Sequence, residues 1–148
     1  MPLSHANLET AIENGIRYLN QIQRPGGDFE TITSSHPDLR TARAYPKSVY
    51  TVASVLHTLS LLESTAVIAG IQEKAVEFLL QEQTEQGAWR WHERYDVEIP
   101  ADLNTTTCAI AALTQVQKPP ELSFYALLWQ NESTAGGPYY TWLDINTD

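Results

Sequence analysis

The chain has 148 residues, and its shares of 43% hydrophobic and 18% charged residues are typical of one globular domain rather than of a disordered chain. Eighteen acidic against nine basic residues give a formal charge of −9, which argues against a nucleic-acid partner because a phosphate backbone would be repelled. The single cysteine, Cys108, excludes an intramolecular disulfide and a metal site built on several cysteines.

No signal peptide or membrane span is recognisable in the sequence. The N-terminal residues carry neither a basic segment nor an apolar core. The apolar runs are interrupted well before the roughly 20 residues that a transmembrane helix needs. We therefore expect a soluble, cytoplasmic protein without a transmembrane segment.

Apolar residues recur at every third or fourth position along most of the chain, which is the period of an amphipathic α-helix. The first helix is predicted over 6–23, and the polar stretch that follows it, up to Pro46, is predicted to be loop. Further helices are predicted over 48–63, 66–84, 103–116 and 121–130, with loop after them. The pattern therefore predicts an all-α fold of five helices.

The chain also repeats itself. A shift of 60 residues aligns one set of positions, in which Gln23, Gly27 and Phe29 fall on Gln83, Gly87 and Trp89. A shift of 54 residues aligns a second set, in which Pro46, Ser48 and Thr51 fall on Pro100, Asp102 and Thr105. The repeating unit is thus a helix, a turn with Gln and Gly-x-aromatic, a loop, a Pro-x-(Ser/Asp)-x-x-Thr segment and a second helix.

We interpret the chain as one α/α-repeat domain with units at 6–63 and 66–116 and a partial third unit at 121–148. The third unit is recognised by Gln130, Gly137 and Tyr139, with a longer gap after the glutamine, and lacks a partner helix. We therefore expect an open arc of helix pairs. Its apolar helix faces would be covered by self-association in a homo-oligomer, by a partner chain or by further sequence.

The segment from Gln83 to Trp89 resembles the QW motif, Gln-x(3)-Gly-x-Trp, of squalene–hopene cyclases, oxidosqualene cyclases and related class II terpene cyclases. The segment from Gln23 to Phe29 resembles a degenerate copy. In physical terms the glycine allows a left-handed backbone that ends a helix, the aromatic ring packs over that end, and the glutamine amide binds unpaired peptide groups there. The resemblance covers about residues 6–142 and implies an incomplete arc of an α/α toroid, a ring of helix pairs shared with protein prenyltransferase β-subunits.

Class II cyclases carry Asp-x-Asp-Asp-Thr at the start of an inner helix, and the middle aspartate protonates an alkene or epoxide. The matching stretch here runs from Asp102 to Thr106 and has Asn104 at the middle position. An amide has no ionisable proton, so we expect no protonation through this motif. Asp102 is left as the catalytic candidate, although it also fits a plain helix N-cap, as Ser48 does in the first unit.

If the motif faces a central cavity, the resemblance implies an isoprenoid or triterpenoid ligand there. The substrate-binding candidates are Trp91, Tyr95, Asp102, Asn104 and Thr105. Trp89 is assigned to the turn instead.

No cofactor or metal is expected. Zinc of the prenyltransferase kind would need an Asp and a Cys two residues apart plus a histidine, whereas Cys108 lies six residues after Asp102. Cys108 fits a buried small side chain, and His57 fits a surface or core histidine rather than a base. Arg90 and Arg94 fit surface charge, with diphosphate binding as the alternative.

Two classes of function remain open at this point. One is a terpene-cyclase-like or prenyltransferase-like domain that binds an isoprenoid or triterpenoid, either as an isomerase-like enzyme or without catalysis. The other is a non-catalytic helical-repeat interaction module. A fragment of a larger cyclase fits the same pattern.

Overall fold

The computed structural model describes residues 5–34, 36–38, 40, 43–45, 47–92, 99–120 and 123–143. These residues form an all-α fold, as predicted. The helices are α1 (His5–Ile22), α2 (Val49–Leu59), α3 (Ala66–Gln81), α4 (Leu103–Gln115) and α5 (Ser123–Gln130). None of these helices is long and apolar enough to cross a membrane.

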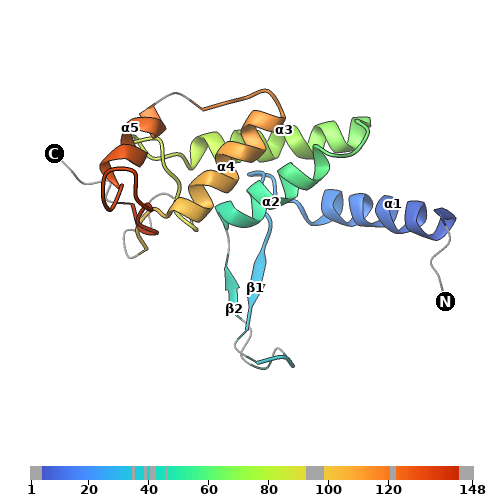
Figure 1. The fold of residues 1–148 in the computed structure, drawn as a ribbon. Helices are drawn as coiled ribbons and strands as arrows, with labels where there is room; N and C mark the ends of the chain where they lie inside the picture. The colour runs from blue at the N-terminus through green and yellow to red at the C-terminus, as the bar shows by residue number, and fades with distance from the viewer. Residues whose placement is uncertain are drawn as a thin grey trace.

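A short β-hairpin lies between α1 and α2, where loop was predicted. Strand β1 (Thr31–Thr33) pairs antiparallel with β2 (Arg43–Tyr45), with Thr31 opposite Tyr45. The loop prediction is wrong for these strands because a strand of three residues is too short to show an alternating pattern. The hairpin projects away from the helices (Figure 1).

Helices α2 and α4 lie side by side and run in the same direction, while α3 packs on α2 and runs the opposite way (Figure 1). Helix α1 contacts α3. The main core forms between these helices from aliphatic residues on α2 and α3, small residues on α4 and two aromatic rings from the repeated turns. Its largest fully buried members include Trp89, Phe29, Leu56, Ile68, Ile71, Leu79 and Leu113. Each side chain of this size adds roughly 1.5–3 kcal/mol to stability when it is buried.

The two turns with Gln and Gly-x-aromatic have the same backbone structure. Gly27 and Gly87 both have positive φ, at 91° and 84°. In each turn the glycine N–H donates to the carbonyl three residues earlier, and the glutamine Nε2 donates to the glycine carbonyl. The 60-residue shift therefore aligns residues that have the same local structure.

The third turn differs from the predicted alignment. Gln130 is exposed, and Asn131 is the buried amide, whose Nδ2 donates to the Leu127 carbonyl. The glycine with positive φ is Gly136 rather than Gly137. Tyr139 remains exposed, unlike Phe29 and Trp89.

Candidate functional site

A cavity of about 210 Å³ lies where α2 and α4 begin. Its lining residues are Tyr50, Trp91, Asp102, Asn104, Thr105 and Trp142. Four of the five predicted substrate-binding residues are thus brought together in one place. The fifth, Tyr95, lies outside the described residues.

Backbone hydrogen bonds between neighbouring units hold the two tryptophans over the helix starts. The N–H of Val49, the first residue of α2, donates to the Trp91 carbonyl over 2.9 Å. The N–H of Leu103, the first residue of α4, donates to the Thr141 carbonyl over 2.8 Å, and Trp142 forms a β-bridge with Asp102. Each helix start is therefore covered by the segment that follows the next turn.

Asp102 is the N-cap of α4, as its sequence position predicted. Its Oδ1 accepts a hydrogen bond from the Thr105 N–H over 2.7 Å, and the residue is only 7% exposed. No described residue donates to the second oxygen, Oδ2, and that atom is not sealed in the interior. Because Asp102 lines the cavity, Oδ2 is the oxygen available to a ligand.

The first unit shows what the corresponding positions do in the other repeat. Ser48 caps α2, and Thr51 Oγ1 donates to Ser48 Oγ and shares a hydrogen bond of 2.7 Å with Thr31 Oγ1. These three polar side chains therefore satisfy one another.

In the second unit, Asp102, Thr105 and Trp91 occupy the corresponding positions. No described residue forms a hydrogen bond with the Thr105 hydroxyl, and the indole of Trp91 replaces the third hydroxyl of the first unit. No described residue forms a hydrogen bond with the side-chain amide of Asn104 either, and Asn104 is exposed. The cluster that is closed in the first unit is open in the second and faces the cavity.

Three aromatic side chains surround these polar groups. Trp91 is 41% exposed although the His92 ring stacks on it, with ring centroids 5.2 Å apart. Tyr50 and Trp142 are also partly exposed at the cavity. Aromatic walls with a few unpaired polar groups are typical of small-molecule sites.

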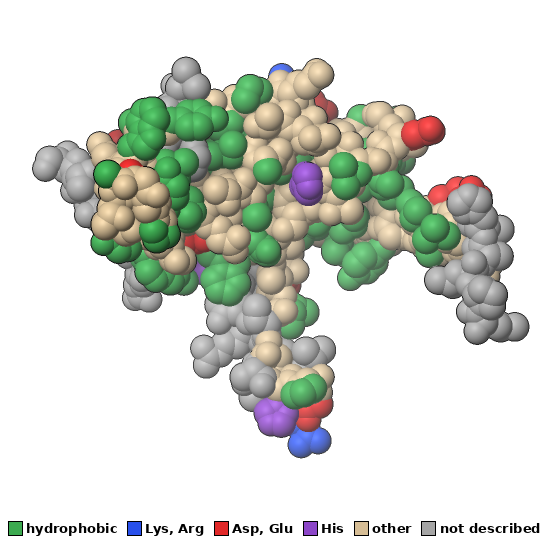
Figure 2. Space-filling model, viewed as in Figure 1, with side chains coloured by type: hydrophobic (Ala, Val, Ile, Leu, Met, Phe, Trp, Pro, Cys, Tyr) green, Lys and Arg blue, Asp and Glu red, His purple; other side chains and the backbone are tan. Residues whose placement is uncertain are grey.

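A second cavity of about 450 Å³ continues along the seam between the two helices. Its lining residues are Ala53, Ser54, His57 and Thr58 of α2, and Thr107, Cys108 and Ala111 of α4. Residues at spacings of three and four share one helix face, so Asn104, Cys108 and Ala111 follow one another along α4. The two cavities thus follow one another along the seam between α2 and α4, and we refer to the residues that line them as the groove. Figure 2, in the same view as Figure 1, shows mostly uncharged side chains where these helices lie.

The other candidates are placed as follows. Trp89 is fully buried, and its Nε1 donates to the Leu79 carbonyl over 2.7 Å. His57 is exposed, and Cys108 is half-buried. Burial raises the pKa of the Cys108 thiol, and the charge of Asp102 raises that pKa further, so the thiol stays protonated at neutral pH.

Arg90 is buried rather than part of the surface. It is 8% exposed, and its Nη1 donates to the Ile99 carbonyl over 2.6 Å. The surface-charge prediction is wrong here because the chain folds back over Arg90 at Ile99, a contact between residues nine apart. Arg94 lies outside the described residues.

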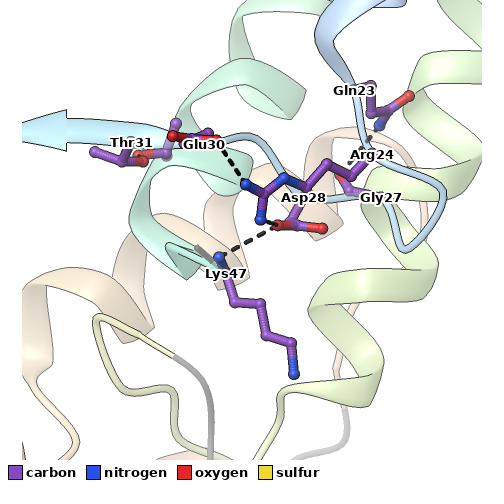
Figure 3. A network of polar contacts seen from close by, with 8 residues as sticks. Gln23, Arg24, Gly27, Asp28, Glu30, Thr31 and Lys47 are labelled. Atoms are coloured by element: carbon purple, nitrogen blue, oxygen red, sulfur yellow. Dashed lines mark hydrogen bonds and ion pairs between the residues drawn. The ribbon is translucent and has the colours of Figure 1, made fainter. Parts of the chain in front are cut away.

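A separate polar cluster lies at the first turn. Figure 3 shows the Arg24 guanidinium between the carboxylates of Asp28 and Glu30, at 3.4 and 2.7 Å. The Lys47 N–H also donates to Asp28 Oδ2. These groups satisfy one another and join the turn to the start of α2, so we assign them a structural role.

The sequence did not predict that Tyr50 and Trp142 line the cavity. A signal existed for Tyr50, because the 54-residue shift places it on Asn104.

No group of three or more His, Cys, Asp or Glu side chains within the described residues could hold a metal ion. No family model matches the chain, and no match was found among curated proteins or solved structures.

Proposed function

We propose that the chain binds an isoprenoid or triterpenoid in the groove between α2 and α4 and does not start a cyclisation through the segment from Asp102 to Asn104. The observation that carries the proposal is the cavity at the two helix starts, where three aromatic side chains meet the unpaired polar groups. In this proposal α2 and α4 are neighbouring inner helices of an α/α toroid. The groove is then part of the concave wall.

The chemistry of the site favours binding over protonation. The amide of Asn104 cannot release a proton, and one oxygen of Asp102 is already used by the helix cap. The apolar walls can bury a hydrocarbon chain, with a gain of about 0.8 kcal/mol for each buried CH₂.

The test is a fluorescence and calorimetric titration with farnesol. We expect saturable binding that weakens about tenfold in Trp91→Ala, because an aromatic wall contributes on the order of 1 kcal/mol beyond its buried area. Trp129→Ala is the matched control, since Trp129 is 72% exposed on α5 and lines neither cavity. Absence of binding to the unmodified chain, or equal weakening in both variants, would contradict the proposal.

A second candidate, the helical-repeat interaction module, is favoured by helix α1. None of its described side chains is buried, and Leu8, Ile12 and Ile22 are all exposed. A partner helix packed on this face would bury them. Concentration-dependent mass in light scattering, abolished by Ile12→Glu, together with no farnesol binding, would favour this candidate.

A further inference from the structure

Asp102 is the one carboxylate among the described residues that line the groove, and no lysine or arginine is among these residues. A carboxylate that is 7% exposed has lost most of its hydration, and no described cation pairs with it. A buried charge of this kind is stabilised by an opposite charge.

The unpaired oxygen of Asp102 restricts which ligand groups can lie beside it. An ionised carboxylate only accepts hydrogen bonds. A phosphate, diphosphate or carboxylate would therefore be repelled by it, and the described lining residues include no lysine or arginine that would offset the repulsion. A positively charged group would be attracted.

The aromatic walls favour the same sign of charge. The faces of Trp91, Trp142 and Tyr50 are electronegative, and cations bind to such faces within about 6 Å of the ring centre. The partial positive charges of the α2 and α4 N-termini oppose this attraction. Their effect is limited because a helix end carries about half a unit charge, and four of the N–H groups there, those of Val49, Thr51, Leu103 and Thr105, already have acceptors.

We infer that the cavity binds an organic ammonium group, held by Asp102 Oδ2 and by the faces of Trp91, Trp142 and Tyr50. The ligand is thus an amphiphile with a cationic nitrogen at the helix starts and an apolar part that extends toward Ala111. The inference rests on the proposed function only in taking this cavity as the ligand site, and it does not depend on the chemistry of the apolar part.

The test compares two compounds of nearly equal shape, choline and 3,3-dimethylbutan-1-ol, which differ in the charge of the central atom. Binding is measured by calorimetry and by changes in tryptophan fluorescence. We expect choline to bind about tenfold more tightly than the neutral alcohol, a difference typical of a cation held by aromatic faces and a carboxylate. Equal affinities, or tighter binding of inorganic diphosphate, would overturn the inference.

Asp102→Asn is the decisive variant, because asparagine caps a helix as well as aspartate does but carries no charge. It should reduce the preference for choline several-fold, because only the aromatic faces then favour the cation. Glu63→Gln removes the same charge from an exposed residue that lines neither cavity, and it should leave the preference intact. Circular-dichroism melts verify that both variants are folded. Retention of the preference in Asp102→Asn would contradict the inference.

The farnesol titration separates this inference from the proposed function. Farnesol binding without a preference for choline would overturn the ammonium inference alone. Binding of choline that depends on Asp102, without farnesol binding, would support the inference and contradict the isoprenoid proposal.

Discussion

The two carboxylate oxygens of Asp102 have different surroundings. Oδ1 accepts the hydrogen bond that caps α4, while Oδ2 accepts no hydrogen bond from a described residue. Ser48, at the corresponding position of the first unit, also caps its helix, and its hydroxyl is enclosed by Thr51 and Thr31. The cap position thus lines a cavity in the second unit and belongs to a closed hydrogen-bonded cluster in the first. The second unit has Trp91 where the first has Thr31, so it lacks the third hydroxyl that closes the cluster.

The cap predicts how stability responds at Asp102. Asp102→Ala should lower the free energy of unfolding by about 1 kcal/mol, because the Thr105 N–H loses its acceptor. Asp102→Asn should leave it nearly unchanged, since the amide oxygen can accept the same bond. Urea denaturation measures both values. Equal losses in the two variants would show that the charge, and not the cap, stabilises this helix.

Cys108 reports on the charge of Asp102. Burial, and secondly the Asp102 carboxylate, raise the pKa of its thiol. Asp102→Asn removes the second cause, so the thiol pKa should fall while staying above its ordinary value. The rate of iodoacetamide alkylation against pH measures the change. The alkylation rate can be assigned to Cys108 because the chain has one cysteine. An unchanged profile would contradict the effect of Asp102 on the thiol.

At the scale of the elements, hydrogen bonds attach both repeated turns to helix α3. Gln23 Nε2 donates to the Gly27 carbonyl within the turn and to the Ile71 carbonyl of α3, 48 residues away. In the second turn the indole of Trp89 donates to the Leu79 carbonyl of α3. Both turns therefore pack on α3 and fix where the following segments leave the core.

Gly27 should not tolerate a side chain. A Cβ at this position would lie 2.1 Å from the Lys74 carbonyl oxygen, and the φ of 91° is itself unfavourable for other residues. We expect Gly27→Ala to lower the free energy of unfolding by about 2 kcal/mol or more. Thermal and urea unfolding provide the measurement.

Gly70→Ala is the control for this substitution, because a Cβ at Gly70 meets no atom within 4 Å and the residue lies inside α3. It should be neutral or stabilising by up to about 1 kcal/mol. Comparable destabilisation by both substitutions would contradict the role assigned to the first turn.

At the scale of the whole molecule, the groove depends on two helices from different units. Helices α2 and α4 contact each other along their length, and each supplies one wall. From Tyr50 to His57 the groove follows α2 for roughly 10 Å, at 1.5 Å per residue. An elongated ligand fits this shape better than a compact one.

The net charge of the molecule should also lower its stability to heat. A formal charge of −9 produces self-repulsion that is relieved on unfolding. Raising sodium chloride from 10 to 300 mM should therefore raise the midpoint of thermal unfolding, by roughly 2–4 °C for each 1 kcal/mol gained. Sucrose at matched osmolality is the control for a general solvent effect. A fall in the midpoint with salt would contradict this account.

The parts of the structure that follow from local interactions were predictable. The five helices were predicted to within four residues at each end, because the apolar period of a helix can be recognised from residues that are close together in the sequence. The cap at Asp102 was predicted for the same reason, since it joins residues three apart. The hairpin was missed because its pairing joins short strands about ten residues apart.

The sequence alone determined the helices, the repeated turns and the replacement of the middle acid by Asn104. These features depend on neighbouring residues and on side-chain chemistry. The tertiary structure alone decided that Tyr50 and Trp142 join Trp91 and Asp102 in one cavity and that Arg90 is buried. The cavity depends on contacts between units, and a local pattern does not encode which surfaces meet when helices from different units pack together. The burial of Arg90 depends on its contact with Ile99, which the helical period does not show either.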